Sequence, residues 1–217
     1  MKKLFVLFVA MALVAAFAVP CLATIVGTKH DFTVGTDSTA IKAVTNQGDE
    51  ICKACHVPHN AIATSGTYDV SGILWAKDYG AANITGQTLK VRNSILCMGC
   101  HDGVIADAAN TDPAAPKFDF TTRTTALGTD LTNDHPVDVV YTWYDTTKSY
   151  AQTAFKDPAT FAGKIRLYTG TDASTNNVAC QSCHDVHGKA DSTGANIPKF
   201  LRINNSASAL CLTCHNK

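Results

Sequence analysis

Hydrophobic and polar residues follow one another irregularly along most of this 217-residue chain. No long stretch repeats its apolar positions every three to four residues, so no long amphipathic helix is expected. The best strand candidate runs from Val137 to Trp143, where every second residue is hydrophobic and Val140 is the one additional apolar residue. The pattern therefore predicts a chain dominated by loops.

The N-terminus has a different pattern. Lysines at positions 2 and 3 precede an uncharged run from Leu4 to Val19, and small residues offer a cleavage point after Ala23. This order is typical of a secretory signal peptide, here residues 1–23. A membrane anchor is the alternative, but the run is shorter than the about 18 apolar residues of a spanning helix. A lipid anchor on Cys21 fits poorly, because Pro20 stands where such sites prefer a small residue.

The cysteines carry the clearest chemical pattern. Four times along the chain, two cysteines separated by two residues are followed at once by a histidine. In this arrangement each thiol adds across a vinyl group of haem, and the histidine ligates the iron. The sequence therefore predicts four covalently attached haem c groups. They belong to motif 1 (Cys52, Cys55, His56), motif 2 (Cys97, Cys100, His101), motif 3 (Cys180, Cys183, His184) and motif 4 (Cys211, Cys214, His215).

Other uses of C-x-x-C pairs fit less well. A structural zinc site draws two such pairs together and needs no histidine directly after each. A redox disulfide of the thioredoxin type needs a βαβ context, which the motifs lack. Cleavage after Ala23 would remove the ninth cysteine, so that every remaining cysteine lies in a motif. We expect a secreted protein, extracellular or on the outer surface, with the periplasm as the alternative.

Size and charge limit which fold class and which partners are expected. Without Lys2 and Lys3, 16 basic and 18 acidic residues remain, a formal charge of −2. There is no basic patch, so nucleic acid is not an expected partner. With so little periodicity, the core must come from the macrocycles, each of which buries on the order of several hundred Å². The expected fold is a multihaem cytochrome c, mostly loops with few strands, whose short helices follow several motifs, for example around Gly103 to Ala109.

The histidines and motifs repeat in the two halves of the chain. Each half has a lone histidine, then a motif extended to C-x-x-C-H-x-x-H, then a plain C-x-x-C-H motif. This order predicts a single tetrahaem domain, residues 24–217, made of two haem-pair modules. The modules cover about residues 24–112 and 118–217, with a linker at Pro113 to Lys117 between them.

The second axial ligand of each iron follows by elimination. Haem iron in c-type cytochromes takes this ligand from Met or His. Met1 and Met11 leave with the signal peptide, and Met98 lies inside its own motif, where it cannot reach across the ring. Four histidines remain for four irons, so bis-histidine coordination is expected throughout. The distal ligands are then His30, His59, His135 and His187.

Chain length limits which haem each distal histidine can serve. His59 follows His56 by three residues, too few to reach the opposite face of the same haem. His59 and, likewise, His187 must therefore serve neighbouring haems and tie two haems together. We expect His59 to serve the haem of motif 2 and His187 that of motif 4. His30 and His135 are left for motifs 1 and 3, in an order that the sequence does not fix.

Several short stretches resemble a known group of proteins. They are G-T-K-H-D at Gly27, C-K-A-C-H-V-P-H at Cys52, I-L-W at Ile73, C-M-G-C-H-D-G at Cys97, N-D-H-P-V at Asn133 and C-Q-S-C-H-D-V-H at Cys180. These stretches look like the doubled C-x-x-C-H cytochromes of metal-reducing bacteria. Within that group, the chain is similar to the secreted tetrahaem cytochromes that polymerise into extracellular filaments, often called cytochrome nanowires. The resemblance spans nearly the whole mature chain.

The resemblance implies properties that spacing and composition do not give. Members of this family have little regular secondary structure and a continuous row of haems in alternating stacked and T-shaped pairs. They also donate one axial histidine across the subunit interface, and by resemblance His30 is the candidate for that donation. The chain would then bind copies of itself, and redox partner proteins or extracellular acceptors such as metal oxides.

The expected function is extracellular electron transfer through low-potential bis-histidine haems, as the subunit of a filament and not as an enzyme. A monomeric periplasmic electron shuttle is the first alternative, with the same chemistry and no polymer. A multihaem reductase is the second. It needs an iron with an open position, and eight histidines for four irons argue against one.

Overall fold

The computed structural model describes residues 84–103, 127–189 and 196–217 without a break, together with residues 25, 26, 28, 30, 31, 51, 52, 55–57, 59, 61–65 and 68–75. The predicted signal peptide and linker lie outside these residues, as does all but the first residue of the helix expected at Gly103 to Ala109. Within the described ranges, every helix is too short or too polar to cross a membrane.

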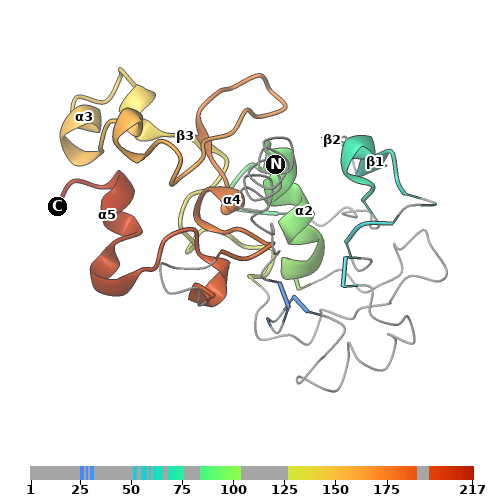
Figure 1. The fold of residues 1–217 in the computed structure, drawn as a ribbon. Helices are drawn as coiled ribbons and strands as arrows, with labels where there is room; N and C mark the ends of the chain where they lie inside the picture. Colours follow the sequence, from blue (N-terminus) through green and yellow to red (C-terminus); the bar gives the residue numbers. More distant parts are fainter. Residues whose placement is uncertain are drawn as a thin grey trace, which may run out of the picture.

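Regular elements are short and widely spaced along the chain (Figure 1). The α-helices are α2 (Arg92–His101), α3 (Ala151–Ala154), α4 (Cys180–Cys183) and α5 (Cys211–Cys214). The 3₁₀ helices are η1 (Ser71–Ile73), η3 (Thr142–Tyr144), η4 (Pro158–Phe161), η5 (Pro198–Phe200) and η6 (Ser206–Ser208). Strand β1 (Thr64–Ser65) pairs antiparallel with β2 (Tyr68–Asp69), and β3 (Val139–Val140) with β4 (Asn177–Val178). The described part of the chain is thus mostly loops, as the sequence predicts.

The elements follow one another across the molecule in three groups. Helices α2 and α4 pack against each other in the middle of the view in Figure 1. Helices α3 and α5 lie at one end, where Asn216 N–H donates to Ala154 O at 2.8 Å and so ties the C-terminus to α3. The β1–β2 hairpin lies at the opposite end.

Three of the described α-helices, α2, α4 and α5, lie on cysteine motifs. Helix α2 ends at His101, the last residue of motif 2, and α4 and α5 span both cysteines of motifs 3 and 4. One helical turn places residues i and i+3 on the same face, so the two thiols of a motif point the same way. In motifs 3 and 4 the histidine then leaves the helix in an extended conformation, with φ −110° at His184 and −98° at His215. The chain therefore changes direction at the predicted iron ligand.

The strand predicted from Val137 to Trp143 is much shorter in the structure. Only β3 (Val139–Val140) is extended and paired, and η3 begins at Thr142. Just before β3, Asp138 takes a left-handed conformation (φ 58°) with its side chain buried. The polar residue is therefore inside and Val139 exposed, the reverse of what the alternating pattern predicts.

An apolar core lies next to motif 4. Its buried centre is formed by Tyr141, Phe161 and Ile165. The rings of Phe155 and Phe161 each meet the Tyr141 ring edge-on, with centroids 5.6 Å apart, an arrangement that adds about 1 kcal/mol to area burial. The Tyr141 hydroxyl lies 2.8 Å from Cys214 O, to which it can donate. This core therefore holds motif 4 in place.

Hydrogen bonds also join the two halves of the chain. Leu131 N–H donates to Thr85 O at 3.0 Å. Gln87 bridges the same segments, because its Nε2 donates to Leu131 O and its Oε1 accepts from Val137 N–H, each at 2.7 Å. The segment before motif 2 is thus fastened to the loop that carries His135.

Candidate haem centres

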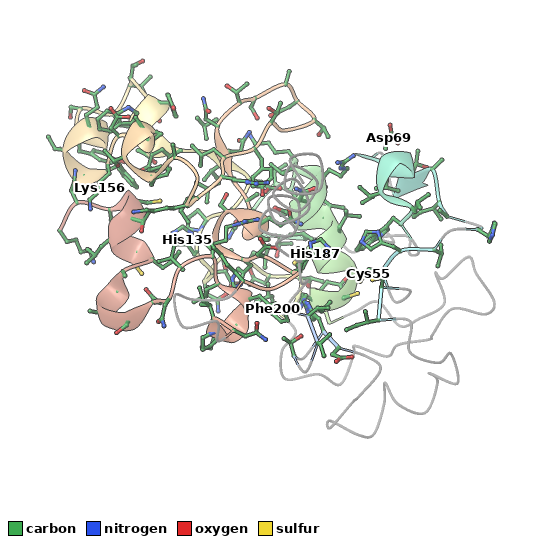
Figure 2. All side chains as sticks on the ribbon, viewed as in Figure 1. Cys55, Asp69, His135, Lys156, His187 and Phe200 are labelled. Carbon is green, nitrogen blue, oxygen red and sulfur yellow. The ribbon has the colours of Figure 1, made fainter. Side chains whose placement is uncertain are left out.

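Three pairs of histidine rings face each other across a nearly constant gap. The ring centroids are 6.1 Å apart for His30 and His101, 6.4 Å for His56 and His187, and 6.4 Å for His135 and His215. Each pair joins the histidine of one C-x-x-C-H motif to one of the predicted distal histidines. In Figure 2, His187 lies next to Cys55 of motif 1, far from it in the sequence.

This separation fits an iron atom held by two imidazoles. A metal–imidazole bond is about 2 Å long and the nitrogen lies roughly 1 Å from the ring centre, so two histidines on one metal have centroids about 6 Å apart. In every pair one histidine follows two cysteines directly, which are the residues that attach haem c. The residues present therefore fit haem at motifs 1, 2 and 4.

A backbone carbonyl orients several of these rings. Each of three Nδ1 atoms lies within hydrogen-bonding distance of a carbonyl oxygen: His56 of Ile73 at 2.5 Å, His135 of Pro136 at 3.0 Å, and His184 of Lys199 at 2.9 Å. A proton on Nδ1 that is donated to the carbonyl leaves Nε2 with a free lone pair, which is the form that binds a metal. Backbone carbonyls thus orient the motif histidines His56 and His184 and the predicted distal histidine His135.

The His30 ring is held neutral by its surroundings. Burial, and then the nearby rings of His101 and His184, lower the pKa of His30 to about 4. Its ring also stacks on Phe200, with centroids 4.5 Å apart and 21° between the planes. At neutral pH the imidazole is therefore unprotonated and able to coordinate iron.

The ring pairs differ from the ligand pairs that chain order predicts. His187 faces motif 1 and not motif 4, while His135 faces motif 4 and His30 faces motif 2, the place expected for His59. His187 follows motif 3 but lies near motif 1, as expected from a tether too short to reach around its own haem. Chain order misleads because α4 packs on α2 and brings the second half of the chain onto the first.

His59 and His184 are the two histidines left over. Both are exposed, and no ring contact in the described part of the chain joins either one to another histidine. The ring of His184 is nevertheless fixed by its hydrogen bond to Lys199 O. Motif 3 therefore has an oriented, exposed histidine.

Motifs 2 and 3 lie directly side by side. Between helices α2 and α4, Asn93 Nδ2 donates to Gln181 Oε1 at 2.7 Å and Cys180 N–H donates to Ser94 Oγ at 3.2 Å. The Cys97 and Cys180 thiols lie close enough to interact, which raises the pKa of Cys97 and lowers that of Cys180. A cysteine of motif 2 thus lies beside a cysteine of motif 3.

Sequence reasoning missed the turn that positions two of these histidines. Lys199 and Phe200 both have left-handed backbones, with φ of 58° and 56°, which is rare for residues other than glycine. This conformation gives the Lys199 carbonyl to His184 and the Phe200 ring to His30. Pro198 signals a turn at this place, but no residue in it signals a left-handed pair.

The described residues contain no group of three or more Cys, His, Asp or Glu side chains gathered as a closed metal site would require. No family model matches the chain, and no curated protein matches it.

Proposed function

We propose that this chain is a secreted electron-transfer protein that carries four covalently attached haem c groups, each held by two histidines. The observation that carries the proposal is the ring separation of 6.1–6.4 Å in three pairs, each of which joins a motif histidine to a distal one. Iron between two imidazoles accounts for that spacing, and the adjacent cysteines account for attachment. The likeness of the sequence to filament-forming tetrahaem cytochromes supports the same function.

The residues of each centre have separate tasks. The two cysteines would anchor the macrocycle through thioether bonds, and the two imidazoles would ligate its iron. Hydrogen bonds from Nδ1 to backbone carbonyls keep the rings from turning. When bound, haem supplies one-electron exchange between ferric and ferrous iron. Rings held in place by backbone carbonyls would keep the reorganisation at each transfer small.

Motif 3 is central to the proposed electron path. His187, three residues beyond this motif, faces the histidine of motif 1. The Cys97 and Cys180 thiols join motif 3 to motif 2, and Cys183 lies near enough to Cys211 of motif 4 for their charges to interact. The chain thus holds all four attachment sites in one connected group.

Production of the protein with a cytochrome c maturation system tests this proposal. The intact mass should increase by four haem groups, and the ferric protein should have the visible spectrum of low-spin iron. A matched control with Cys211→Ala and Cys214→Ala should gain three. A chain that folds with no covalent haem, or that takes up zinc at its cysteines instead, would contradict the proposal.

We further propose that copies of the chain assemble into a filament outside the cell. His59 and His184 support this, because both are exposed and lack a histidine partner among the ring contacts of the described residues. A second copy that offers His59 to the centre of His184 would complete the fourth site and join two subunits. His30, which the resemblance suggests for that role, faces His101 of its own chain. Such a filament would take electrons from redox proteins and deliver them to extracellular acceptors such as metal oxides.

Two other functions use the same residues differently. A monomeric periplasmic shuttle would have four centres and no polymer, so electron microscopy of the secreted protein separates it from a filament. A reductase would keep the position opposite His184 open for substrate, since this histidine has no ring partner among the described residues. High-spin ferric iron that persists in the assembled protein would favour the reductase.

A further inference from the structure

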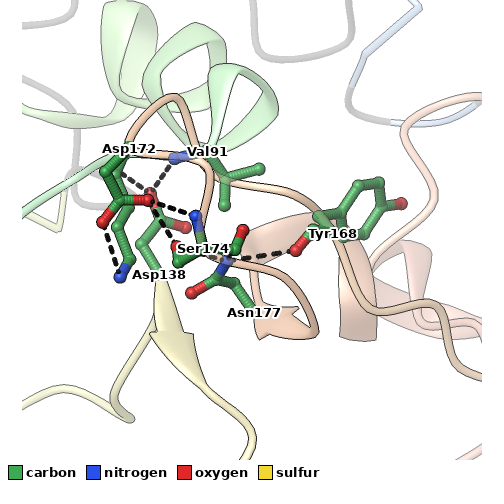
Figure 3. A network of polar contacts seen from close by, with 7 residues as sticks. Val91, Asp138, Tyr168, Asp172, Ser174 and Asn177 are labelled. Carbon is green, nitrogen blue, oxygen red and sulfur yellow. Dashed lines mark hydrogen bonds and ion pairs between the residues drawn. The ribbon is translucent and has the colours of Figure 1, made fainter.

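Asp138 is a buried carboxylate at the junction of the two halves of the chain (Figure 3). The residue is 2% exposed. Its Oδ2 accepts hydrogen bonds from the backbone amides of Lys90 (2.8 Å) and Val91 (2.9 Å), and its Oδ1 accepts one from Ser94 Oγ at 2.5 Å. These donors lie at the start of α2, where a negative charge stabilises the helix. The loop after His135 thus supplies the anion that caps the helix of motif 2.

The directions of the hydrogen bonds favour the ionised form of Asp138. Ser94 Oγ accepts from Cys180 N–H at 3.2 Å, so the hydroxyl hydrogen is available for the carboxylate. All three partners can therefore donate to Asp138, and none needs a proton from it. Burial raises the pKa of Asp138, while the bonds from Ser94, Val91 and Lys90 oppose that rise.

This charge lies beside the attachment sites of two haems. The carboxylate acts electrostatically on both Cys97 and Cys180, where it disfavours the thiolate form. These two thiols belong to α2 and α4, which pack against each other. Lys90, whose backbone amide donates to Asp138, directs its ammonium group to the exposed Asp172 at 3.3 Å. Within the described structure, Asp138 therefore has hydrogen bonds but no salt bridge.

We propose that Asp138 lowers the reduction potentials of the haems on motifs 2 and 3 by acting as a fixed buried anion. The inference rests on the proposed function, since it concerns bound haem. Ferric haem carries one more positive charge than ferrous haem, so a nearby anion stabilises the ferric form and makes reduction harder. The effect is strong at a buried site because little water screens the charge.

Asp138→Asn removes the charge at nearly constant volume and tests the inference by redox titration followed in the visible spectrum. Two of the four one-electron steps should move to higher potential while the other two stay. Asp172→Asn is the matched control, because it removes an exposed carboxylate from the same network and should move none. Asn93→Ala removes the hydrogen bond to Gln181 between the same two helices but leaves all three donors of Asp138 in place, so its four potentials should also stay in place.

Either of two results overturns the inference: unmoved potentials in Asp138→Asn, or an equal shift in Asn93→Ala, which would assign the effect to packing between α2 and α4. If Asp138→Asn does not fold, Asp138→Ser removes the same charge and leaves space for water beside the Lys90 and Val91 amides. The intact mass of each variant separates this test from that of the proposed function. Four attached haems with unmoved potentials reject the role of Asp138 alone, whereas a wild-type chain without haem rejects both.

Discussion

The ring planes of the histidine pairs meet at different angles. The angle is 19° for His56 and His187 and 78° for His135 and His215. Parallel imidazoles on one iron act on the same d orbital and separate it in energy from its partner, whereas perpendicular imidazoles leave the two nearly equal. Parallel rings therefore give a rhombic low-spin ferric EPR signal, and perpendicular rings a strongly anisotropic one. With iron bound as proposed, these angles would make the centres of the two pairs distinguishable by spectroscopy.

Replacement of His187 by alanine uses this difference to test which motif it serves. We expect His187→Ala to abolish the rhombic signal of the parallel pair with His56 and to create one high-spin ferric centre. The anisotropic signal from His135 and His215 should remain. Loss of the anisotropic signal instead would restore the pairing with motif 4 that chain order predicts.

At the level of single residues, all three ring pairs join a motif histidine to a histidine that elimination selects, because the count of ligands needs no knowledge of the fold. Chain order predicts other partners, since partnership depends on packing between distant segments. The sequence does not predict that Asp138 is buried, because a carboxylate in an alternating pattern normally faces solvent. Only the fold turns its side chain towards α2.

At the level of elements, the four-residue helices α4 and α5 are too short to be stable alone. Their boundaries coincide with the cysteines, so covalent attachment to haem would hold what helix propensity does not. Periodicity could not predict these helices, because one turn buries no repeated apolar stripe. The strand predicted from Val137 to Trp143 is shorter in the structure for a related reason. Its continuation was decided by the left-handed Asp138, a tertiary contact and not a local preference.

The segment that precedes α2 offers a direct test of packing between the halves. Gly86 has φ +80°, and a Cβ atom there would lie 2.6 Å from Thr132 N. We expect Gly86→Ala to lose about 1–2 kcal/mol of unfolding free energy from the left-handed backbone, and a further 1–3 kcal/mol from overpacking against Thr132. Gly163→Ala is the control, with φ +81° and nothing within 4 Å. Denaturant unfolding that gives both variants the same loss would mean that Thr132 moves aside without cost.

At the level of the whole molecule, motif 3 lies near each of the other three motifs. His187, three residues beyond motif 3, faces the histidine of motif 1. The cysteines of motif 3 lie near Cys97 of motif 2 and Cys211 of motif 4. The order of the motifs in the chain is therefore not their order in space. The predicted repeat of two modules describes the sequence, whereas the contacts of Gln87 and Asp138 join the halves into one body. His59 and His184 are exposed and have no histidine partner among the described ring contacts. This follows from the arrangement of the whole chain and not from any single motif.

His59 and His184 give the sharpest test of assembly. His59 and His187 occupy the same position, three residues after a motif histidine, yet only His187 has a ring partner among the described contacts of its own chain. Both His59→Ala and His187→Ala should leave one centre per chain high-spin. We expect only His59→Ala to remain as single chains in light scattering and electron microscopy, because its lost ligand would bridge two copies.

Free imidazole separates the loss of a ligand from the loss of the bridge. Added to His59→Ala, imidazole can occupy the position opposite His184 and restore a low-spin spectrum, but it cannot join two chains, so the protein should stay monomeric. Added to His187→Ala, it should restore the spectrum of filaments that were already formed. If His59→Ala polymerises, or if His187→Ala fails to, the bridge between copies is not His59, and the unpaired His184 would have to be completed in another way.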